Sequence, residues 1–257
     1  MSSPTKTILI TGASRGIGLA LVEQYQKDGW NVIAAVRNVQ TADKLQALAP
    51  YKIVSMDTSD EASILKAAEE LKDQVIDVLI NNAGIARNDT IESATRDSIL
   101  DQFIVNTLGP FLVTRALLPN LRAAAKAQGT SVVAQVSSVL GSITGNWSGG
   151  LFGYRCSKAG VNMVNANYAI ALKDDNIIAL ALHPGYVSTD MTGNEGSVTP
   201  AATAAGFAKV IAGATMTDSG KFIKYNGKEL PCGGADMVAF GCLHMSNPDL
   251  AERLQND

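Results

Sequence analysis

Residues 7–18 read Thr-Ile-Leu-Ile-Thr-Gly-Ala-Ser-Arg-Gly-Ile-Gly and decide the fold. The apolar run from Thr7 to Ile10 predicts a buried strand, and the apolar spacing after Gly18 predicts a helix. Because Gly12, Gly16 and Gly18 lack a Cβ, the backbone can come close to a pyrophosphate, whose charge the free amides at a helix N-terminus favour. A strand, a glycine turn and a helix in this order predict a dinucleotide site, although the turn alone also fits a plain strand-to-helix connection.

Apolar runs alternate with helical patterns along the rest of the chain. This alternation predicts right-handed βαβ crossovers and a parallel sheet with helices on both faces. We therefore predict a single doubly wound Rossmann domain of the α/β class over residues 1–257, with 46% hydrophobic residues to fill its core. The expected strands are 7–10, 31–36, 52–56, 75–80, 131–136 and 177–182. The expected helices are 17–28, 61–72, 98–127, 154–173 and 201–212, the third of them kinked or restarted at Pro119.

The C-terminal third of the chain is less regular. An irregular, glycine-containing segment that leaves the end of a strand predicts a substrate lid over about 185–215. The tail 233–257 follows Cys232 and contains apolar residues that can pack on something. It can cover the substrate pocket, join a neighbouring subunit or project into solvent, and these alternatives stay open. The apolar residues of the tail are Met237, Val238, Phe240, Leu243, Met245, Leu250 and Leu254.

Composition argues against several function classes. The net charge is −3, and the absence of a long Lys/Arg run makes a nucleic-acid partner unexpected. We expect no membrane span, because apolar runs such as 177–182 are too short, and the N-terminus lacks a signal-peptide layout. Cys156, Cys232 and Cys242 form no CxxC pair, which favours a reducing compartment and a cytoplasmic protein. No His, Cys and carboxylate cluster has metal-ligand spacing, so no metal is expected.

Tyr154 and Lys158 carry the chemical prediction. Residues four apart lie on one face of a helix, so the ammonium can favour the phenolate and lower the pKa of the phenol. Moving that pKa from about 10 to near 7 or 8 needs roughly 3 to 4 kcal/mol, and makes tyrosine an acid usable near neutral pH. Together with the glycine turn, the pair predicts hydride transfer. The alternative is a helix tyrosine whose hydroxyl faces water.

The end of the second expected strand favours NADPH/NADP+ over the unphosphorylated cofactor. A carboxylate there would accept from the ribose 2′-hydroxyl, but this chain has Ala35, Val36, Arg37 and Asn38. Arg15 and Arg37 can meet a 2′-phosphate as planar forks, although both can equally be solvated.

Two polar features follow the next strands. Asp57 can accept from the adenine amino group or help to cap the following helix. The run Asn81-Asn82-Ala83-Gly84 suits a close approach of the backbone to the cofactor, or forms a polar turn.

Taken together, these motifs resemble the short-chain dehydrogenase/reductase family over residues 7 to about 232. The resemblance implies a catalytic set in which Tyr154 gives a proton to the substrate carbonyl and Lys158 also holds the nicotinamide ribose. It implies that Ser138 donates to the substrate oxygen and that Asn106 anchors a water relay. The cofactor-binding residues implied are Gly12, Ser14, Arg15, Gly16, Ile17, Gly18, Arg37, Asp57, Asn82, Ala83, Gly84, Tyr154, Lys158, Pro184, Gly185, Val187 and Thr189.

Residues 141–150 are similar to the carbonyl-reductase-like branch of this family, with the sniffer and C-factor proteins. The sixteen-residue step from Ser138 to Tyr154 matches the longer loop of that branch, whereas Cys232 stands where a tryptophan is common. Ser137 points the opposite way along a strand. The resemblance favours Ser138, because it precedes the turn Val139-Leu140-Gly141 as the family's serine precedes the same kind of turn. His183 and His244 are predicted to be structural.

The resemblance implies an NADPH-dependent carbonyl reductase acting on an aldehyde, a ketone or a keto group of a larger metabolite. The partner is then a small-molecule carbonyl substrate, and a homodimer is compatible with the family. Two other functions fit less well: a nucleotide-binding signalling or sensor protein with little turnover, and an epimerase or dehydratase. The expected pocket residues, which can equally be core, are Val139, Ile143, Trp147, Leu151, Tyr186 and Met191.

Overall fold

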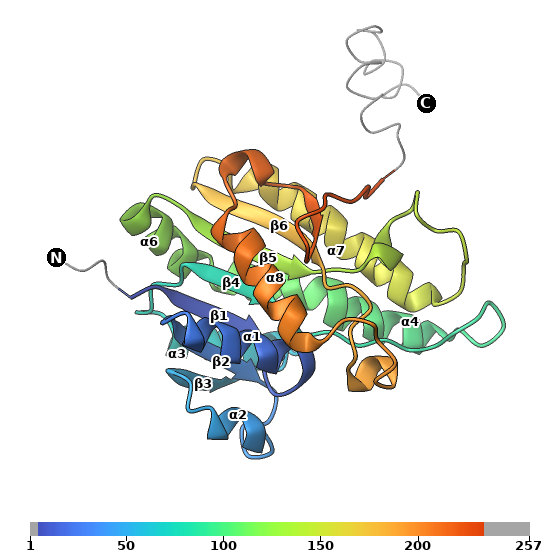
Figure 1. Cartoon of the computed structure of the whole chain (residues 1–257), viewed down its shortest axis with the longest axis horizontal. Coiled ribbons are helices and arrows are strands. Elements are labelled where there is room, and N and C mark those ends of the chain that lie inside the picture. Colours follow the sequence, from blue (N-terminus) through green and yellow to red (C-terminus); the bar gives the residue numbers. More distant parts are fainter. Residues whose placement is uncertain (1–4, 234–257) are drawn as a thin grey trace, which may run out of the picture.

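The structure is a computed structural model that describes residues 5–233, and it contains a seven-stranded parallel sheet with helices on both faces (Figure 1). The predicted doubly wound α/β fold is confirmed. The strands, in the order β3-β2-β1-β4-β5-β6-β7 across the sheet, are β1 (Thr7–Thr11), β2 (Asn31–Val36), β3 (Lys52–Ser55), β4 (Val78–Asn81), β5 (Ser131–Val136), β6 (Ile177–His183) and β7 (Phe222–Lys224). The α-helices are α1 (Gly16–Lys27), α2 (Asp43–Ala47), α3 (Glu61–Glu70), α4 (Arg96–Phe103), α5 (Gly109–Ala116), α6 (Leu118–Gln128), α7 (Phe152–Ala171) and α8 (Pro200–Ala212).

Alternate residues of each central strand enter two separate cores. In β1, Ile8 and Ile10 pack with Leu21 of α1 and Phe207 of α8 on one face of the sheet. Leu9 points to the other face, into a second apolar layer made with α3, α5, α6 and α7. Burial on both faces explains why the strands read as continuous apolar runs. None of the helices described is both long enough and apolar enough to cross a bilayer.

The main differences from the predicted elements are one strand boundary and two short elements that were not predicted. The fourth strand begins at Val78 rather than Val75, because the chain first turns so that the carboxylate of Asp77 accepts from the backbone N–H of Thr7 at 2.8 Å. The edge strand β7 was not predicted, and its three residues are too few to show a pattern. The same holds for the five-residue helix α2.

The long helix predicted over 98–127 is interrupted twice. One break lies at Leu117, and α6 restarts at Leu118 so that Pro119 stands in its first turn, where its missing N–H costs no bond. The second interruption was not predicted: a π-helical turn at Ile104–Leu108 joins α4 to α5. That turn carries Asn106, and π-helical turns occur often at functional sites.

The segment predicted as a lid has two parts. Residues 200–212 form α8, which packs on α1 through Phe207, so this part is a fixed layer of the fold. Residues 185–199 stay outside the regular helices and strands, except for a short 3-10 turn at Asp190–Thr192. Of the tail predicted over 233–257, only Gly233 belongs to the described residues.

The sheet order places a topological switch between β1 and β4. These two strands are hydrogen-bonded neighbours, but the chain runs from β1 outward to β2 and β3, and from β4 outward to β5, β6 and β7. In open α/β sheets, ligands bind outside the carboxyl ends of the strands at such a point. The residues that follow β1 and β4 are therefore the place to look for a site.

Candidate active site

The glycine turn after β1 and the amide turn after β4 touch each other at the switch point. A Cβ added at Gly12 would lie 2.9 Å from the Cα of Ala83, which leaves no room for a side chain. Asn82 fastens the two turns, since its Nδ2 donates to the carbonyl oxygens of Thr11 at 2.9 Å and Gly12 at 3.2 Å. At Gly18 a Cβ would come within 2.2 Å of the Gly12 carbonyl oxygen. The turn of Gly12, Gly16 and Gly18, packed against Ala83 and Asn82, is called the glycine cradle below, and it lies at the switch point where open α/β sheets bind ligands.

The N-terminus of α1 opens toward the same point. Gly16 is the first residue of α1 and has a φ of 54°, a conformation that glycine adopts without strain. Its neighbours Ser14 and Ile17 are half-buried, and no side chain caps the helix. The free amides of this first turn are therefore available to an anionic group such as a pyrophosphate.

Tyr154 and Ser138 lie together at the carboxyl edge of the sheet. Tyr154 is in the first turn of α7, and Ser138 follows β5 and accepts from the backbone N–H of Leu140 at 3.2 Å. Burial raises the pKa of Tyr154, and a hydrogen-bonding interaction with Ser138 acts in the opposite direction. Ser137 points elsewhere and donates to Oδ1 of Asn162 at 2.6 Å. The structure thus brings Ser138, not Ser137, to Tyr154.

The lowered phenol pKa predicted from the Tyr154-to-Lys158 spacing is wrong for this structure, where the pKa of Tyr154 is raised. The ammonium of Lys158 lies 5.7 Å from the centre of the Tyr154 ring and donates to the carbonyl oxygen of Val136 at 2.7 Å. Burial also lowers the pKa of Lys158 to about 8. The helical spacing does bring the groups together, but burial in a low-dielectric site disfavours both charged forms. Tyr154 therefore keeps its proton at neutral pH.

Asn106, Lys158 and Gly84 meet behind the tyrosine. A Cβ at Gly84 would lie 3.1 Å from Oδ1 of Asn106 and 3.6 Å from Nζ of Lys158. The Asn106 side chain is fully engaged: Oδ1 accepts from the N–H of Ile85 at 2.8 Å, and Nδ2 donates to the Ile85 carbonyl at 2.8 Å and to Oγ of Ser157 at 3.0 Å. It ties the turn after β4 to α7, while its role in a water relay stays a prediction.

The segment 184–189 closes the side of the glycine turn. Val187 is buried and forms an isolated parallel bridge with Val198. Thr189 packs on the turn, because a Cβ at Gly16 would meet its Cγ2 at 3.3 Å. Pro184 and Gly185 are half-buried, and Gly185 has a φ of 87° beside the ring of Tyr225. Of the four residues predicted in this segment, Thr189 contacts the glycine turn, and the other three lie in the chain that leads from β6 to it.

The residues predicted to choose the cofactor are exposed. Arg37 lies just after β2, and Arg15 just before α1. Arg15 forms an ion pair of 3.4 Å with Asp190, and both side chains are well exposed, so the pair contributes little and can be exchanged for a phosphate. Asp57 accepts from the N–H and Oγ of Ser59, whereas Asp60 caps α3. The adenine contact of Asp57 stays a prediction.

Arg155 was missed by the sequence analysis. Its guanidinium is buried, with 9% of the residue exposed. It donates to the carbonyls of Gly149 and Gly150 at 3.1 Å, to that of Leu140 at 3.4 Å and to Oγ of Ser148 at 2.8 Å. Arg155 therefore holds the loop between Ser138 and Tyr154 in one shape. The sequence carried no sign of this role, because Arg155 bonds mainly to backbone carbonyl oxygens and not to an acidic side chain that could be paired with it by spacing.

His183 supports the same loop from β6. Its Nδ1 accepts from the backbone N–H of Val139 at 3.3 Å, so Nδ1 carries no proton and the imidazole is neutral. Burial, together with the charge of Lys224, lowers the pKa of His183 to about 4. The predicted structural role of His183 agrees with these contacts, and the imidazole positions the residue that follows Ser138. His244 lies outside the described residues.

We expect His183 to make the protein acid-sensitive in a defined window. Between an unfolded pKa of about 6.5 and a folded pKa of about 4, the unfolded chain binds more protons, so the free energy of unfolding falls as the pH drops. The loss reaches roughly 3 kcal/mol below pH 4. Urea unfolding of wild type and His183→Asn from pH 7 to 4 measures it. In the variant, the free energy of unfolding should not show this additional fall between pH 7 and 4. The same dependence on pH in both proteins would contradict the assignment.

Of the six predicted pocket residues, five are exposed and Leu151 is half-buried, so the core alternative is wrong for those five. Trp147 is 90% exposed. The exposed residues belong to the loop after Ser138 and to the segment after β6, both of which begin beside the catalytic candidates. The five are Val139, Ile143, Trp147, Tyr186 and Met191.

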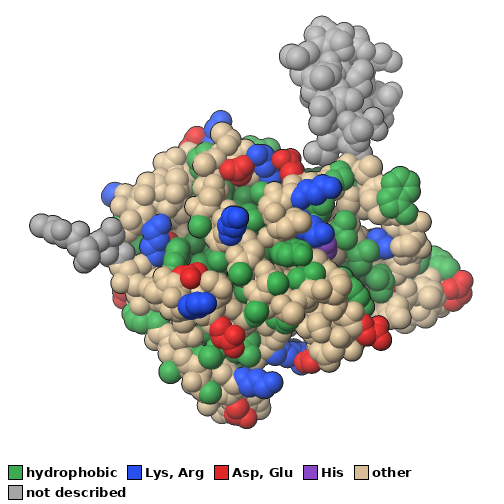
Figure 2. All heavy atoms as spheres, viewed as in Figure 1, with side chains coloured by type: hydrophobic (Ala, Val, Ile, Leu, Met, Phe, Trp, Pro, Cys, Tyr) green, Lys and Arg blue, Asp and Glu red, His purple; other side chains and the backbone are tan. Residues whose placement is uncertain are grey.

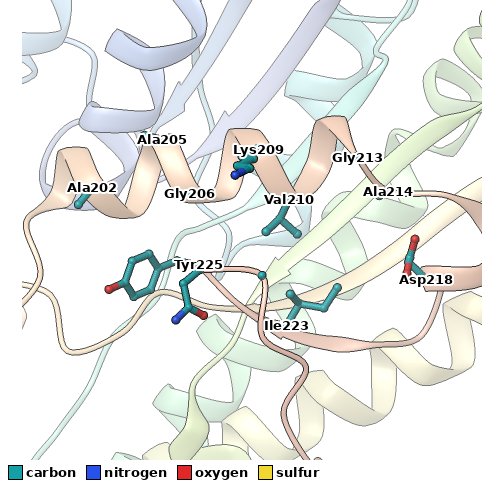
Figure 3. A pocket seen from close by; sticks show the side chains of 12 residues that line it. Ala202, Ala205, Gly206, Lys209, Val210, Gly213, Ala214, Asp218, Ile223 and Tyr225 are labelled. Atoms are coloured by element: carbon teal, nitrogen blue, oxygen red, sulfur yellow. The ribbon is translucent and has the colours of Figure 1, made fainter.

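A separate hollow of about 540 Å³ lies between α8 and the turn after β7 (Figure 3). Figure 3 shows Val210 and Ile223 facing its interior, with Tyr225 at one end. Its carboxylate, Asp218, is already engaged by Lys221 at 2.7 Å. The hollow contains none of the predicted site residues. Within residues 5–233, no group of three or more His, Cys, Asp or Glu side chains is arranged to hold a metal ion.

Comparisons with known proteins agree with this geometry. A family model described as short chain dehydrogenase matches residues 6–199. The solved NADPH-bound carbonyl reductase from chicken fatty liver is 36% identical, with a TM-score of 0.82 over 88% of this chain and 99% of that one. Carbonyl reductase Sniffer of D. melanogaster is 32% identical, with a TM-score of 0.84 over 88% and 99%. The C-signal protein of Myxococcus xanthus is 38% identical over 160 residues, 61% of this chain and 92% of that protein.

Proposed function

This chain belongs to the short-chain dehydrogenase/reductase family, and we propose that within it the protein is an NADPH-dependent carbonyl reductase. Its substrate is an aldehyde, a ketone or a keto group of a larger metabolite, which it converts to an alcohol. The observation that carries the proposal is the grouping of Tyr154 with Ser138 beside the buried Lys158, next to the glycine cradle. An acid next to a nucleotide site is what carbonyl reduction requires.

The residues of the chain divide the chemistry among them. When bound, NADPH supplies the hydride that adds to the carbonyl carbon. Tyr154 gives its proton to the carbonyl oxygen, and Ser138 donates a hydrogen bond to the same oxygen. The raised pKa of Tyr154 keeps the phenol protonated before reaction, and the ammonium of Lys158 stabilises the phenolate that reaction leaves. A proton from water then restores Tyr154, so each turnover uses one hydride and one proton.

The glycine cradle supports a dinucleotide as the cofactor. Gly12 and Gly18 let the turns after β1 and β4 pack directly on each other and on α1, and the uncapped N-terminus of α1 favours the pyrophosphate. Arg15 follows β1 and Arg37 follows the neighbouring parallel strand β2, and both residues are exposed. Their planar guanidinium groups favour the 2′-phosphate of NADPH. The chicken liver carbonyl reductase, which binds NADPH, is similar over 88% of this chain.

We expect Arg37→Ala to raise the KM for NADPH about tenfold, the value of one charge-assisted hydrogen bond, and to leave the KM for NADH unchanged. Arg96→Ala is the matched control, because Arg96 is an exposed arginine paired with Asp97 on α4. Initial rates with both cofactors measure the effect. Faster turnover with NADH than with NADPH in the wild type, or an equal change for both cofactors in Arg37→Ala, would contradict the cofactor assignment.

A second candidate function is a nucleotide-binding signalling protein with little turnover, and the similarity to the C-signal protein favours it. Such a protein needs the cradle but not an acid. The juxtaposition of Tyr154 with Ser138, and of Lys158 with Asn106, argues for turnover. A panel of carbonyl compounds assayed at 340 nm separates the two, because the signalling protein would bind NADPH without oxidising it.

We further propose that the protein works in the cytoplasm as a homodimer. Cys156 and Cys232 are free thiols, which suits a reducing compartment. Apolar side chains are exposed along α4 and α7, and Ile170 has 79% of its surface accessible. A second copy that packs there would cover Phe103 and Met163 as well. Gel filtration should show twice the chain mass of 26.9 kDa, whereas a monomer would contradict this assembly.

A further inference from the structure

The helix that carries Tyr154 begins without a cap of its own. α7 starts at Phe152, and no side chain at the position before it bonds to the free N–H groups of the first turn. Leu151 occupies that position with a φ of 51°, in the left-handed region that residues with a Cβ rarely adopt. Backbone of this kind needs partners from elsewhere in the fold. The position of Tyr154 therefore depends on what holds residues 151–153.

Asp89 holds this stretch from the irregular segment after β4. Its backbone carbonyl oxygen accepts from the N–H of Leu151 at 2.9 Å, and its Oδ2 accepts from the N–H of Gly153 at 3.4 Å. The carboxylate thus stands at the N-terminus of α7, where the helix dipole favours a negative charge. Asp89 and Gly153 are 64 residues apart, so no local sequence pattern links them.

Asp89 is buried, and its charge faces backbone and an amide rather than a cation. Acidic side chains dot the face of the molecule shown in Figure 2, whereas only 4% of Asp89 is exposed. Its Oδ2 also accepts from Nε2 of Gln102 at 3.5 Å, and its Oδ1 has no partner among the described residues. Arg87, two residues earlier, is paired with Asp101 instead. A buried carboxylate of this kind is costly unless its N–H partners stay in place.

The start of α7 also fits tightly against α4. A Cβ added at Gly153 would collide with Nε2 of Gln102. Gln102 cannot yield easily, because it is fully buried and its Oε1 accepts from the N–H of Arg87 at 2.9 Å. A shift of Asp89 or Gln102 would therefore move the turn that carries Tyr154.

We propose that Asp89 is a positioning residue for the reaction. By holding residues 151–153 it fixes where α7 begins, and thereby sets the Tyr154 hydroxyl beside Ser138. This role needs no contact with substrate or cofactor and no proton transfer. The anchoring of α7 stands on these contacts alone, whereas its effect on the rate rests on the proposed reductase function.

Amide hydrogen exchange, followed by NMR without cofactor, tests the anchoring. Asp89→Ala removes the carboxylate, so we expect the Gly153 N–H to exchange about tenfold faster, the worth of one hydrogen bond to a charged group. Asp60→Ala is the matched control, because Asp60 caps α3 by accepting from the N–H of Ala62 at 3.0 Å. It should speed exchange at Ala62 and leave Gly153 unchanged. Wild-type exchange at Gly153 in a folded Asp89→Ala would overturn the proposal.

Kinetics separate the positioning of Tyr154 from a general loss of structure. Asp89→Ala should lower kcat about 10- to 100-fold, since a displacement of about 1 Å can cost about 10²-fold, and should change the KM for NADPH less than about twofold. Asp89→Asn keeps an oxygen for the Gly153 N–H and should retain kcat within about threefold. Asp60→Ala should keep wild-type kcat. In a Tyr154→Phe background, Asp89→Ala should have little further effect.

Two kinetic results would overturn the proposal. One is the same loss from Asp89→Ala with and without the Tyr154 hydroxyl, and the other is the same loss in Asp89→Ala and Asp89→Asn. If Asp89→Ala does not fold, Asp89→Ser gives the same test, because its shorter side chain stops short of Gly153. A wild type without reductase activity would refute the proposed function and the effect on its rate, while exchange at Gly153 would still decide the anchoring.

Discussion

Replacing Tyr154 by phenylalanine is expected to lower kcat for carbonyl reduction by about 10²- to 10⁴-fold, the usual contribution of a positioned general acid. The substitution removes only the hydroxyl that interacts with Ser138 and leaves the ring in the first turn of α7. Affinity for NADPH should change less than twofold, because the glycine cradle is untouched. Steady-state rates at 340 nm and a fluorescence titration of NADPH measure the two quantities separately.

Tyr51→Phe is the matched control for this loss. Tyr51 is exposed and lies just before β3, at the amino end of that strand, whereas the candidate site lies at the carboxyl ends of the strands. It should retain wild-type kcat and NADPH affinity. If Tyr154→Phe bound NADPH normally and kept full reductase activity, the proton would have to come from another group and the assignment of Tyr154 would be wrong.

Gly18→Ala is expected to weaken NADPH binding by about 10²- to 10⁴-fold. The new Cβ would lie 2.2 Å from the Gly12 carbonyl oxygen and 2.7 Å from Nδ2 of Asn82, so the turn after β1 must shift. A shift misaligns the backbone N–H groups of the turn, and the loss of two hydrogen bonds to a charged group is worth about 3 to 6 kcal/mol. Isothermal titration with NADPH measures the change directly.

Gly213→Ala tests whether the effect is specific to the cradle. Gly213 ends α8 with an ordinary φ of −91°, and its nearest neighbour, the carbonyl oxygen of Lys209, would stand 3.5 Å from the added Cβ. This variant should bind NADPH like the wild type. Normal binding by a folded Gly18→Ala, checked by circular dichroism, would show that the turn does not hold the pyrophosphate.

The fold could be predicted because its central strands are buried on both faces. Alternate residues such as Ile8 and Leu9 face separate cores, so β1 reads as one apolar run, and the glycine turn marks where it ends. Patterns failed where an element is short or where distant contacts shape it. The π-helical turn around Asn106 is an example, because the side chain of Asn106 bonds to Ile85, which lies far away in sequence.

The sequence predicted which residues form the candidate site better than it predicted the pKa of Tyr154. Spacing alone brought Tyr154 and Lys158 to one helix face, but it carries no information about burial, which raises the pKa of the phenol. The choice of Ser138 over Ser137 depended on a family resemblance, since strand alternation says only that the two point apart. Arg155 left no signal in sequence because its partners are mainly backbone carbonyls.

The most direct measurement follows the hydride itself. Wild-type protein is mixed with NADPH deuterated at both C4 positions and with a panel of aldehydes and ketones, and the products are analysed by mass spectrometry. We predict that at least one carbonyl compound becomes an alcohol with one deuterium on its carbinol carbon for each NADPH oxidised, and that Tyr154→Phe suppresses this product. Saturating NADPH binding with no deuterated alcohol from any member of the panel would contradict the reductase assignment.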